Sequence, residues 1–286
     1  MTERVRRLRE CSLNTTPSLS LERAALLTEF YSTSGPLSIP MLRASALAHI
    51  LERRTIYIGP DELIVGERGP LPKATPTYPE LCCHSLEDFE ILETREKISY
   101  CVGDEARRIQ RDQVIPYWQG HSMRDRIFAE MKPAWKAAYE AGIFTEFMEQ
   151  RAPGHTVLGD VIYRKGLLDL KREGAEALEH LDFFGDPEAY DKQQELKAMA
   201  VAADAVIRFA ERHAELAGQM AAAEPNAARK AELEKIAAVC RHVPAHAPRD
   251  FHEAIQAYRF THLGVIIELN GWDSFNPGPL DQHLFP

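Results

Sequence analysis

Apolar residues recur at three-, four- and seven-residue steps over much of the chain, and strict alternation of apolar and polar residues is scarce. The first pattern places apolar side chains on one face of an α-helix, whereas alternation would indicate a half-buried strand. The clearest case runs from Pro187 to about Met220. Its repeating apolar residues are Leu196, Met199, Val206, Phe209, Leu216 and Met220. We expect a long amphipathic helix there, with both methionines packed in the core.

Helical patterns with start and stop signals also cover residues 20–35, 39–55, 226–243 and 248–267. In the first of these, Ser20 is the candidate N-cap, and the helix should end near Gly35. In the second, Pro40 falls in the first turn, where its missing N–H is tolerated. Together these segments predict a mostly α-helical chain with few strands.

Two segments between the early helices do not fit a helical pattern. Residues 61–67, "DELIVGE", are a short strand candidate. The loop that follows carries four prolines between Pro70 and Pro79, which disfavours both helix and central strand. A long ordered loop inside a compact chain is often functional.

A helix in the centre of the chain runs into a loop, "FMEQRAPGHTVLGD", and should stop before Pro153. Phe147 lies near the expected helix end, and the Pro-Gly turn presents His155. A histidine held on a tight turn can donate or accept a proton at fixed geometry. The residues alone favour the plainer alternative, in which Gln150, Arg151 and His155 form hydrogen bonds with loop backbone.

Polar residues follow the last apolar run, in "ELNGWDSFNPG". Glu268 and Asn270 stand where a buried element would deliver polar side chains at its end. Asp273 lies between two aromatic residues. Its carboxylate could hold a substrate ammonium, or it could cap the next turn, and the residues alone favour neither.

The composition limits the classes of partner. The 286 residues are 45% hydrophobic, enough for a sizeable core, and the formal net charge of -9 argues against a broad nucleic-acid surface. We find neither a signal peptide nor a membrane-spanning stretch, so we expect a cytoplasmic protein. Five cysteines, two of them adjacent, do not form a disulfide framework, and we expect reduced thiols.

Two groups of cysteine and histidine residues are possible metal ligands. In residues 82–84, adjacent cysteines cannot easily both bind one tetrahedral zinc, and no second ligand pair stands nearby. In residues 240–252, prolines interrupt the helix that would bring His242 and His246 to one face. We therefore expect no metal site. Phosphate-binding glycine motifs and nucleophile elbows are also absent from the sequence.

Three stretches of the chain carry a resemblance to a known family. Residues 76–90, 137–160 and 262–286, with their "PTYPELCCH", "EQRAPGHTV" and "ELNGWDSF" motifs, closely resemble the N-terminal part of glycyl radical enzymes of the pyruvate formate-lyase-like superfamily. Within it they are most similar to the hydroxyproline dehydratase branch. The resemblance runs from about Val5 to the last residue with few gaps.

The resemblance implies a fold and a chemistry. The fold would be the N-terminal part of a ten-stranded α/β barrel, built from two five-stranded half-sheets and wrapped by helices. An activase that uses S-adenosylmethionine and an iron–sulfur cluster would install a radical on a glycine, and a cysteine would relay it to the substrate. The reaction would be radical dehydration of trans-4-hydroxy-L-proline to a pyrroline-5-carboxylate, in an enzyme that is usually a homodimer.

The resemblance also implies roles for three residues. Phe147 would pack on the substrate ring. His155 would be the catalytic residue beside the leaving hydroxyl or in the proton relay to it. Asp273 would pair with the ring nitrogen of the substrate. No metal and no separate cofactor would be bound by this part of the chain.

One departure from the family pattern bears on activity. None of the five cysteines stands in the family's Cys-x-Glu loop, and no glycine-radical motif is present. We therefore expect residues 1–286 to be a single partial domain that stops before both loops and is inactive alone. Two alternatives remain open at this point. One is another glycyl radical lyase or a formate acetyltransferase-like enzyme, and the other is a non-catalytic helical binding protein.

Overall fold

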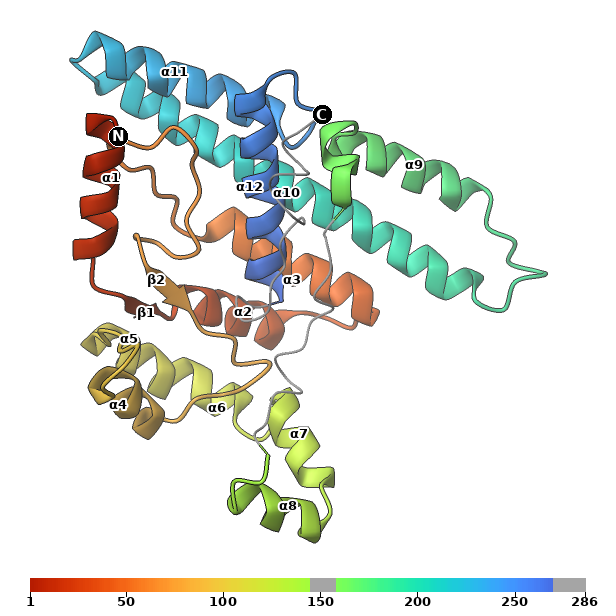
Figure 1. Cartoon of the computed structure of the whole chain (residues 1–286). Coiled ribbons are helices and arrows are strands. Elements are labelled where there is room, and N and C mark those ends of the chain that lie inside the picture. Colours follow the sequence, from red (N-terminus) through yellow and green to blue (C-terminus); the bar gives the residue numbers. More distant parts are fainter. Residues whose placement is uncertain (145–157, 270–286) are drawn as a thin grey trace.

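A computed structural model describes residues 1–144 and 158–269. These ranges are mostly helical, with one small sheet, as the sequence predicts (Figure 1). The α-helices are α1 (Glu3–Asn14), α2 (Glu22–Thr33), α3 (Ile39–Arg53), α4 (Leu86–Thr94), α5 (Asp104–Ile109), α6 (Ile115–Trp118), α7 (Met123–Glu130), α8 (Pro133–Glu140), α9 (Leu167–Glu179), α10 (Ala189–Ala223), α11 (Ala227–His242) and α12 (Phe251–Glu268). The remaining elements are the strands β1 (Ser18–Ser20) and β2 (Ala74–Pro76), the π-helical turn η1 (Gln110–Val114) and the 3-10 turn η3 (Gly159–Tyr163).

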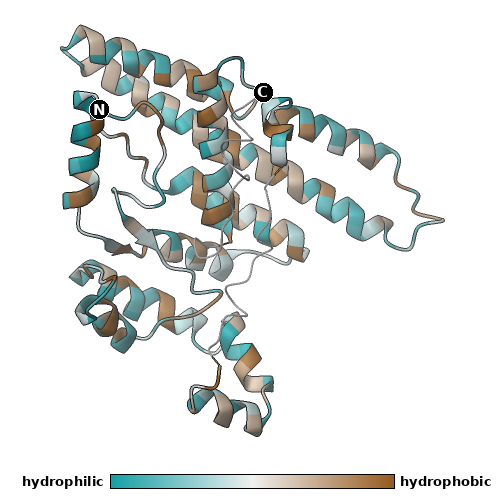
Figure 2. Ribbon diagram, viewed as in Figure 1, coloured by the Kyte–Doolittle hydropathy of each residue, from teal (hydrophilic) through white to brown (hydrophobic). Residues whose placement is uncertain are grey.

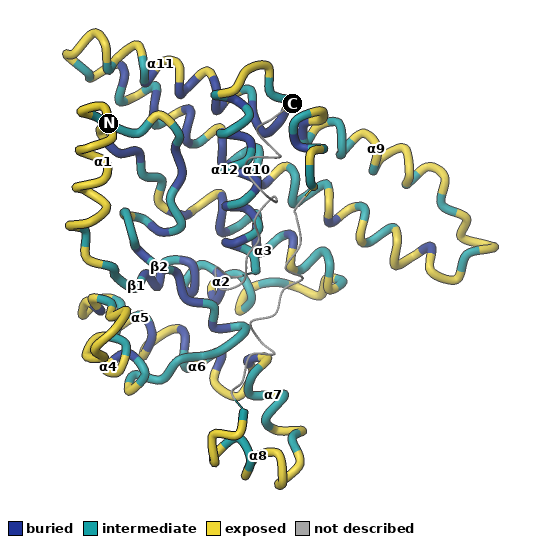
Figure 3. Tube along the Cα trace, viewed as in Figure 1, coloured by how far each residue is buried: buried dark blue, intermediate teal, exposed yellow. Residues whose placement is uncertain are grey.

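The core is organised around α10, which has 35 residues and is therefore about 50 Å long. It packs most extensively against α3 and α11, and also against α9 and α12 (Figure 1). Its buried face is rich in alanine around Phe209, which allows neighbouring helices to approach closely. Figure 3 shows the buried positions concentrated where these helices meet.

The long-helix prediction is confirmed, but one of its methionines is not in the core. Phe209 is fully buried, and Leu216 and Met220 pack against the core cluster. Met199 is 59% exposed, so its predicted core position is wrong. It lines the groove between α9, α10 and α12.

The start of α2 differs from the prediction. Ser20 is not the N-cap, because residues 18–20 are extended in β1 and the helix begins after Leu21. The Ser20 hydroxyl still accepts a hydrogen bond from the Glu22 amide, at 3.4 Å. The helix ends at Thr33, close to the expected end at Gly35. In α3, Pro40 occupies the first turn as expected.

The proline-rich loop contains one short strand, in a two-stranded sheet, which agrees with the prediction that its prolines disfavour a helix and a central strand. β2 pairs in parallel with β1, in the register Ser18 to Ala74, Leu19 to Thr75 and Ser20 to Pro76. Pro76 is tolerated because β2 pairs with a strand along one edge only, and its other edge needs no backbone N–H donor.

The strand predicted over residues 61–67 is wrong, because its backbone is paired with a side chain. The amide of buried Gln256 in α12 accepts from the Val65 N–H and donates to the Val65 C=O, each at 2.9 Å. These two bonds replace the partner strand that Val65 would otherwise need. The segment is therefore an extended loop fixed to a helix.

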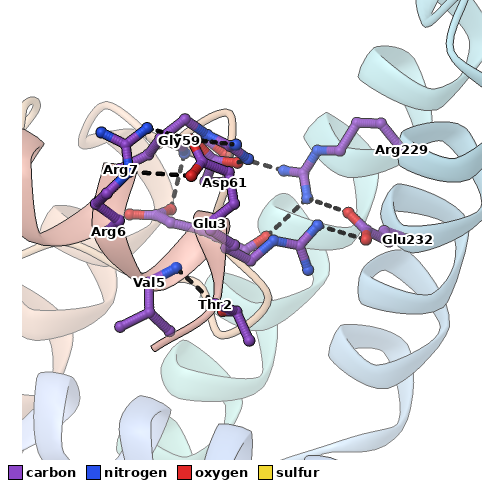
Figure 4. Close-up of polar contacts among 11 residues, drawn as sticks. Thr2, Glu3, Val5, Arg6, Arg7, Gly59, Asp61, Arg229 and Glu232 are labelled. Atoms are coloured by element: carbon purple, nitrogen blue, oxygen red, sulfur yellow. Dashed lines mark hydrogen bonds and ion pairs between the residues drawn. The ribbon is translucent and has the colours of Figure 1, made fainter.

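Helix α1 has no buried residue and is fastened by charged groups (Figure 4). Arg4 pairs with Glu232 of α11 at 2.5 Å, and Arg7 forms a two-bond contact with Asp61 at 2.5 and 2.9 Å. Arg229 donates to the Gly59 carbonyl at 2.9 Å, so α11 also holds the loop that carries Asp61.

Helices α7 and α8 project from the rest of the molecule (Figure 1) and bury no residue. Their contact is aromatic, with ring centroids of Phe128 and Tyr139 4.9 Å apart. α8 ends at Glu140, and Gly142, with a φ of 72°, turns the chain. The expected helix end near Phe147 lies outside the described residues.

Candidate functional site

The three residues to which the sequence assigns roles lie outside the described ranges. Phe147 and His155 fall within residues 145–157, and Asp273 falls within residues 270–286. The structure therefore does not test whether these three residues share one site. The described residues nearest in sequence are Phe144, three residues before Phe147, Leu158, three residues after His155, and Leu269, four residues before Asp273.

Leu158 and Leu269 line the same groove. This apolar groove, of about 340 Å³, lies between α9, α10 and α12. Its lining is formed mostly by leucine, methionine, valine and alanine side chains, including the exposed Met199, with Lys171, Thr261 and Glu268 as its polar members. The described residues next to the His155 and Asp273 segments therefore lie at one groove.

Helix α12 leads to the Asp273 segment. Figure 2 shows hydrophobic stretches, coloured brown, along the ribbon of this helix. Its apolar residues include Phe260, Leu263, Ile266 and Ile267, all buried. Asp250 caps the N-terminus by accepting from the Glu253 amide at 2.9 Å. The prediction that a buried element ends in the polar residue Glu268 is confirmed.

The last carbonyls of α12 accept hydrogen bonds from side chains far away in sequence. The Tyr78 hydroxyl donates to the Ile266 carbonyl at 2.5 Å. Arg23 donates from Nε to the Ile267 carbonyl at 2.5 Å, and from Nη2 to the Glu268 carbonyl at 3.0 Å. A helix C-terminus leaves such carbonyls without intrahelical partners. A positive charge there is also stabilised by the negative end of the helix dipole.

Arg23 is only 6% exposed and is held by a carboxylate and a ring. Glu80 accepts from its two terminal nitrogens at 2.5 and 3.1 Å, and the guanidinium lies 4.0 Å from the centroid of the Tyr78 ring. Burial opposes the charge most strongly, but Glu80, with smaller effects of Tyr78 and Glu268, outweighs it, so the pKa of Arg23 is raised. Burial likewise raises the pKa of Tyr78, which therefore keeps its donor proton.

The carboxylate of Glu268 is also held in place. Arg43 of α3 donates to it from Nε at 2.9 Å and from Nη2. Both the backbone and the side chain at the end of α12 therefore have fixed partners, on α2, α3 and the proline-rich loop.

A larger cavity opens beside this helix end. It has a volume of about 670 Å³ and lies between α2, α3, α7 and the end of α12. Leu27, Leu47 and Trp118 give it apolar walls, while Tyr31 and the Arg23–Glu80 pair add polar groups. Burial, with a smaller effect of Glu80, raises the pKa of Tyr31, so its hydroxyl stays protonated at neutral pH.

Neither cysteine–histidine group is arranged as a metal centre. Over residues 1–144 and 158–269, no three His, Cys, Asp or Glu residues are placed to hold an ion. α11 ends at His242, so the predicted interruption of the helix is confirmed, although the rings of His242 and His246 stack 5.0 Å apart across the turn that follows. Burial raises the pKa of both Cys83 and Cys240 to about 12, which disfavours thiolate chemistry.

The sequence did not single out Arg23, Tyr78 and Glu80. One signal was available, because Arg23 shares a face of α2 with buried Ala24 and Leu27, and a lone arginine on an apolar face needs a partner. Tyr78 and Glu80 stand in "PTYPELCCH", a stretch that carries the family resemblance.

No described helix is both long and apolar enough to span a bilayer.

Fold and sequence together define the class of this protein: the chain belongs to the pyruvate formate lyase-like family, whose model matches residues 1–286. The resemblance predicted from the three quoted stretches is confirmed. Within that class, the chain is 52% identical, over 99% of its length, to trans-4-hydroxy-L-proline dehydratase of Clostridioides difficile. It is 30% identical, over 99% of its length, to isethionate sulfite-lyase of Nitratidesulfovibrio vulgaris.

Solved structures agree with this placement. The crystal structure of the C. difficile hydroxyproline dehydratase, with trans-4-hydroxy-L-proline bound, superposes with a TM-score of 0.95 over 99% of this chain. A glycyl radical enzyme from Archaeoglobus fulgidus, 27% identical, superposes with a TM-score of 0.88 over 99% of this chain. The chain spans about 36% of the length of each of these relatives. The described fold is thus that of a helical part of a glycyl radical enzyme.

Proposed function

We propose that residues 1–286 form one wall of the substrate pocket in a glycyl radical hydro-lyase that dehydrates trans-4-hydroxy-L-proline to a pyrroline-5-carboxylate. The observation that carries this proposal is the 52% identity over 99% of the chain to a dehydratase of that substrate. The margin over the sulfite-lyase relative, at 30%, favours hydroxyproline over a sulfonate.

The radical chemistry is supplied elsewhere. A glycine-borne radical, installed by an S-adenosylmethionine-dependent activase and relayed through a cysteine, supplies removal of hydrogen from the carbon next to the substrate nitrogen. No cysteine of residues 1–286 stands in a Cys-x-Glu motif, so these residues do not fit the relay. We assign to this chain the work of binding, orientation and proton transfer. The activase and a second copy of the complete protein are its proposed partners.

Three residues carry that work. Asp273 pairs with the ring ammonium and so fixes which C–H bond faces the cysteine. His155 donates a proton to the departing hydroxyl, because water leaves more easily than hydroxide. Phe147 packs on the ring and excludes water from the pocket. Leu158 and Leu269, the described residues nearest in sequence to His155 and Asp273, line one groove, and this supports a common site.

The assignment is tested with the natural polypeptide that contains residues 1–286, activated anaerobically. We expect it to consume trans-4-hydroxy-L-proline and form a pyrroline carboxylate, measured by mass spectrometry. Turnover of isethionate or glycerol but not of hydroxyproline would show a different lyase of the family. No turnover of any of them, with a radical signal present, would remove the dehydratase assignment.

Roles of the individual residues are tested by substitution. We expect His155→Ala and Asp273→Ala each to lower kcat/KM at least about 100-fold, since each removes a group that acts on the reacting substrate. The matched controls are His180→Ala and Asp204→Ala, on the exposed surface of α9 and α10. Near-normal turnover of either site variant would exclude the role given to that residue.

A further inference from the structure

The turn between α9 and α10 presents aromatic side chains to solvent. Phe184 is fully exposed, and Phe183 and Tyr190 are 52% and 61% exposed. The two helices form an arm that projects from the core, and this turn is at its free end (Figure 1). Single exposed apolar residues are common on protein surfaces, but three aromatic side chains within eight residues are typical of an interaction site.

Hydrogen bonds fix the backbone that carries these side chains. The Asp182 carboxylate accepts from the Phe184 and Gly185 amides, at 3.0 and 2.9 Å. The Asp182 carbonyl accepts from the Asp186 amide at 3.0 Å. An added Cβ at Gly185 would collide with the Asp182 carboxylate, so the turn requires glycine there. The phenylalanines are therefore held outward by a defined turn, which lowers the entropy cost of binding a partner.

The arm carries a negative charge around these aromatic residues. Residues 176–192, which we call the hairpin tip, contain one lysine and six carboxylates, on Glu176, Glu179, Asp182, Asp186, Glu188 and Asp191. Like charges oppose contact between two hairpin tips, and an anionic lipid surface would also repel this segment. The hairpin tip therefore fits a protein surface that combines basic and apolar side chains.

Such a surface lies on α1 and α11, at the opposite side of the molecule in Figure 1. α1 has four arginines and two glutamates, and α11 has four lysine or arginine residues and two glutamates. The Arg4–Glu232 ion pair joins the two helices into what we call the basic face. Val5, Arg9 and Leu13 follow one another at four-residue steps, so they share one side of α1, and all three are exposed. The basic face thus complements the hairpin tip in charge and in apolar side chains.

We infer that the hairpin tip docks on the basic face of a second copy of the chain. Because the two surfaces lie at opposite sides of each copy, two antiparallel copies can each receive the tip of the other. Such reciprocal contacts close into a two-fold dimer. This assembly rests on the proposed function only in taking a second copy as the partner, and it does not require the dehydration reaction.

The first experiment removes the aromatic side chains and measures dimerisation of the natural polypeptide by sedimentation velocity. We expect the unsubstituted protein to be a dimer. The double variant Phe183→Ser, Phe184→Ser should raise the dimer dissociation constant at least about 100-fold, because buried aromatic residues dominate the energy of most interfaces. The control is Ile91→Ser in α4, which is 60% exposed and should change the constant by less than about twofold.

The second experiment reverses the charge of each surface. Arg9→Glu with Lys230→Glu, on the basic face, should weaken the dimer at least about tenfold. Glu188→Lys with Asp191→Lys, on the hairpin tip, should have the same effect. Combining all four substitutions restores opposite charges, so the dissociation constant should return to within about threefold of the unsubstituted value. The two experiments change different residues, so a variant that does not fold leaves the other as the test.

A monomeric unsubstituted protein would overturn the inference, as would a dimer that the two serine substitutions leave unchanged. If the combined charge reversal stays as weak as either half, the hairpin tip meets another surface, and its pairing with the basic face is wrong. Turnover of trans-4-hydroxy-L-proline by the activated, unsubstituted protein is measured separately. Its absence would overturn the dehydratase assignment while the dimer contact stands.

Discussion

Helix α12 buries nine of its 18 residues, whereas the 12-residue helix α1 buries none. α12 is held by apolar packing and by hydrogen bonds to its end, and α1 by arginines that reach Asp61 and Glu232. Apolar burial contributes about 25 cal/mol per Å², while exposed ion pairs contribute little. We therefore expect damage at α12 to unfold the core, and damage at α1 to release only that helix.

The largest effect should come from the centre of α12. Phe260 is fully buried and contacts Phe209 and His213 edge-on, at centroid distances of 6.0 and 5.2 Å. Phe260→Ala should lower the free energy of unfolding by about 3–5 kcal/mol, since it leaves a cavity. Chemical denaturation measures this, with Leu13→Ala of α1, 66% exposed, as the control. Equal losses in the two variants would contradict the comparison.

A second large effect should come from Gly66, which packs closely against Leu263 of α12. An added Cβ at Gly66 would lie 2.5 Å from the Leu263 side chain, and its φ of 121° is unfavourable for any other residue. Gly66→Ala should therefore lower the free energy of unfolding by about 2–4 kcal/mol.

The control for this substitution is Gly35→Ala, where nothing lies within 4 Å of the added Cβ. Its thermal midpoint should stay within about 2 °C of that of the unsubstituted protein. A Gly66→Ala protein as stable as the control would show that α12 is not closely seated on this loop.

The pH dependence should be set in part by His213, which packs against α12. Burial, with smaller effects from Arg54, Arg212 and Arg259, lowers its pKa from 6.5 to about 4, although its bond to the Phe209 carbonyl acts the other way. Between these values the unfolded chain binds a proton that the folded chain does not. Stability should therefore fall as the pH falls from about 6.5 to about 4, by up to about 3 kcal/mol.

Unfolding by denaturant at pH 7.5 and pH 5 checks this dependence. His213→Gln should flatten the slope below pH 6.5, and His180→Gln, at the exposed end of α9, should leave it unchanged. An unaltered slope in His213→Gln would assign the acid sensitivity to other groups.

The smallest effect should come from α1. Arg4 and Glu232 are about 30% exposed, so water and salt screen their attraction. A double-mutant cycle with Arg4→Ala and Glu232→Ala should give a coupling below about 1 kcal/mol, which weakens in 1 M salt. A coupling of several kcal/mol would place α1 in the cooperative core.

Local pattern predicted most of the helices because their signals lie within a few residues. The spacing of apolar residues from Leu196 to Met220 was sufficient for α10, and Pro40 marked the start of α3. The wrong strand at residues 61–67 had the opposite cause, since its backbone partner, Gln256, is 191 residues away. The prediction that Met199 packs in the core was wrong for a related reason, because periodicity identifies a face of a helix but not the neighbour that covers it.

The candidate site divides along the same line. The family resemblance, carried by short motifs, was predictable and is confirmed. The hydrogen bonds that hold the C-terminal end of α12 could not be predicted, because Arg23 meets Glu80 across 57 residues and Ile267 across 244 residues. The roles of Phe147, His155 and Asp273 stay predictions, since all three lie outside the described ranges.

The sequence separation between Arg23 and Ile267 also determines the order in which the contacts of Arg23 can form during protein synthesis. At about 5–20 residues per second, the ribosome adds the 244 intervening residues in roughly 10–50 s. Glu80, only 57 residues away, emerges within a few seconds to about 10 s, so the ion pair can form first. Until α12 has been synthesised, the Arg23 guanidinium has no access to the carbonyls of Ile267 and Glu268. The contacts at the last turn of α12 can therefore form only after these 244 residues have been added.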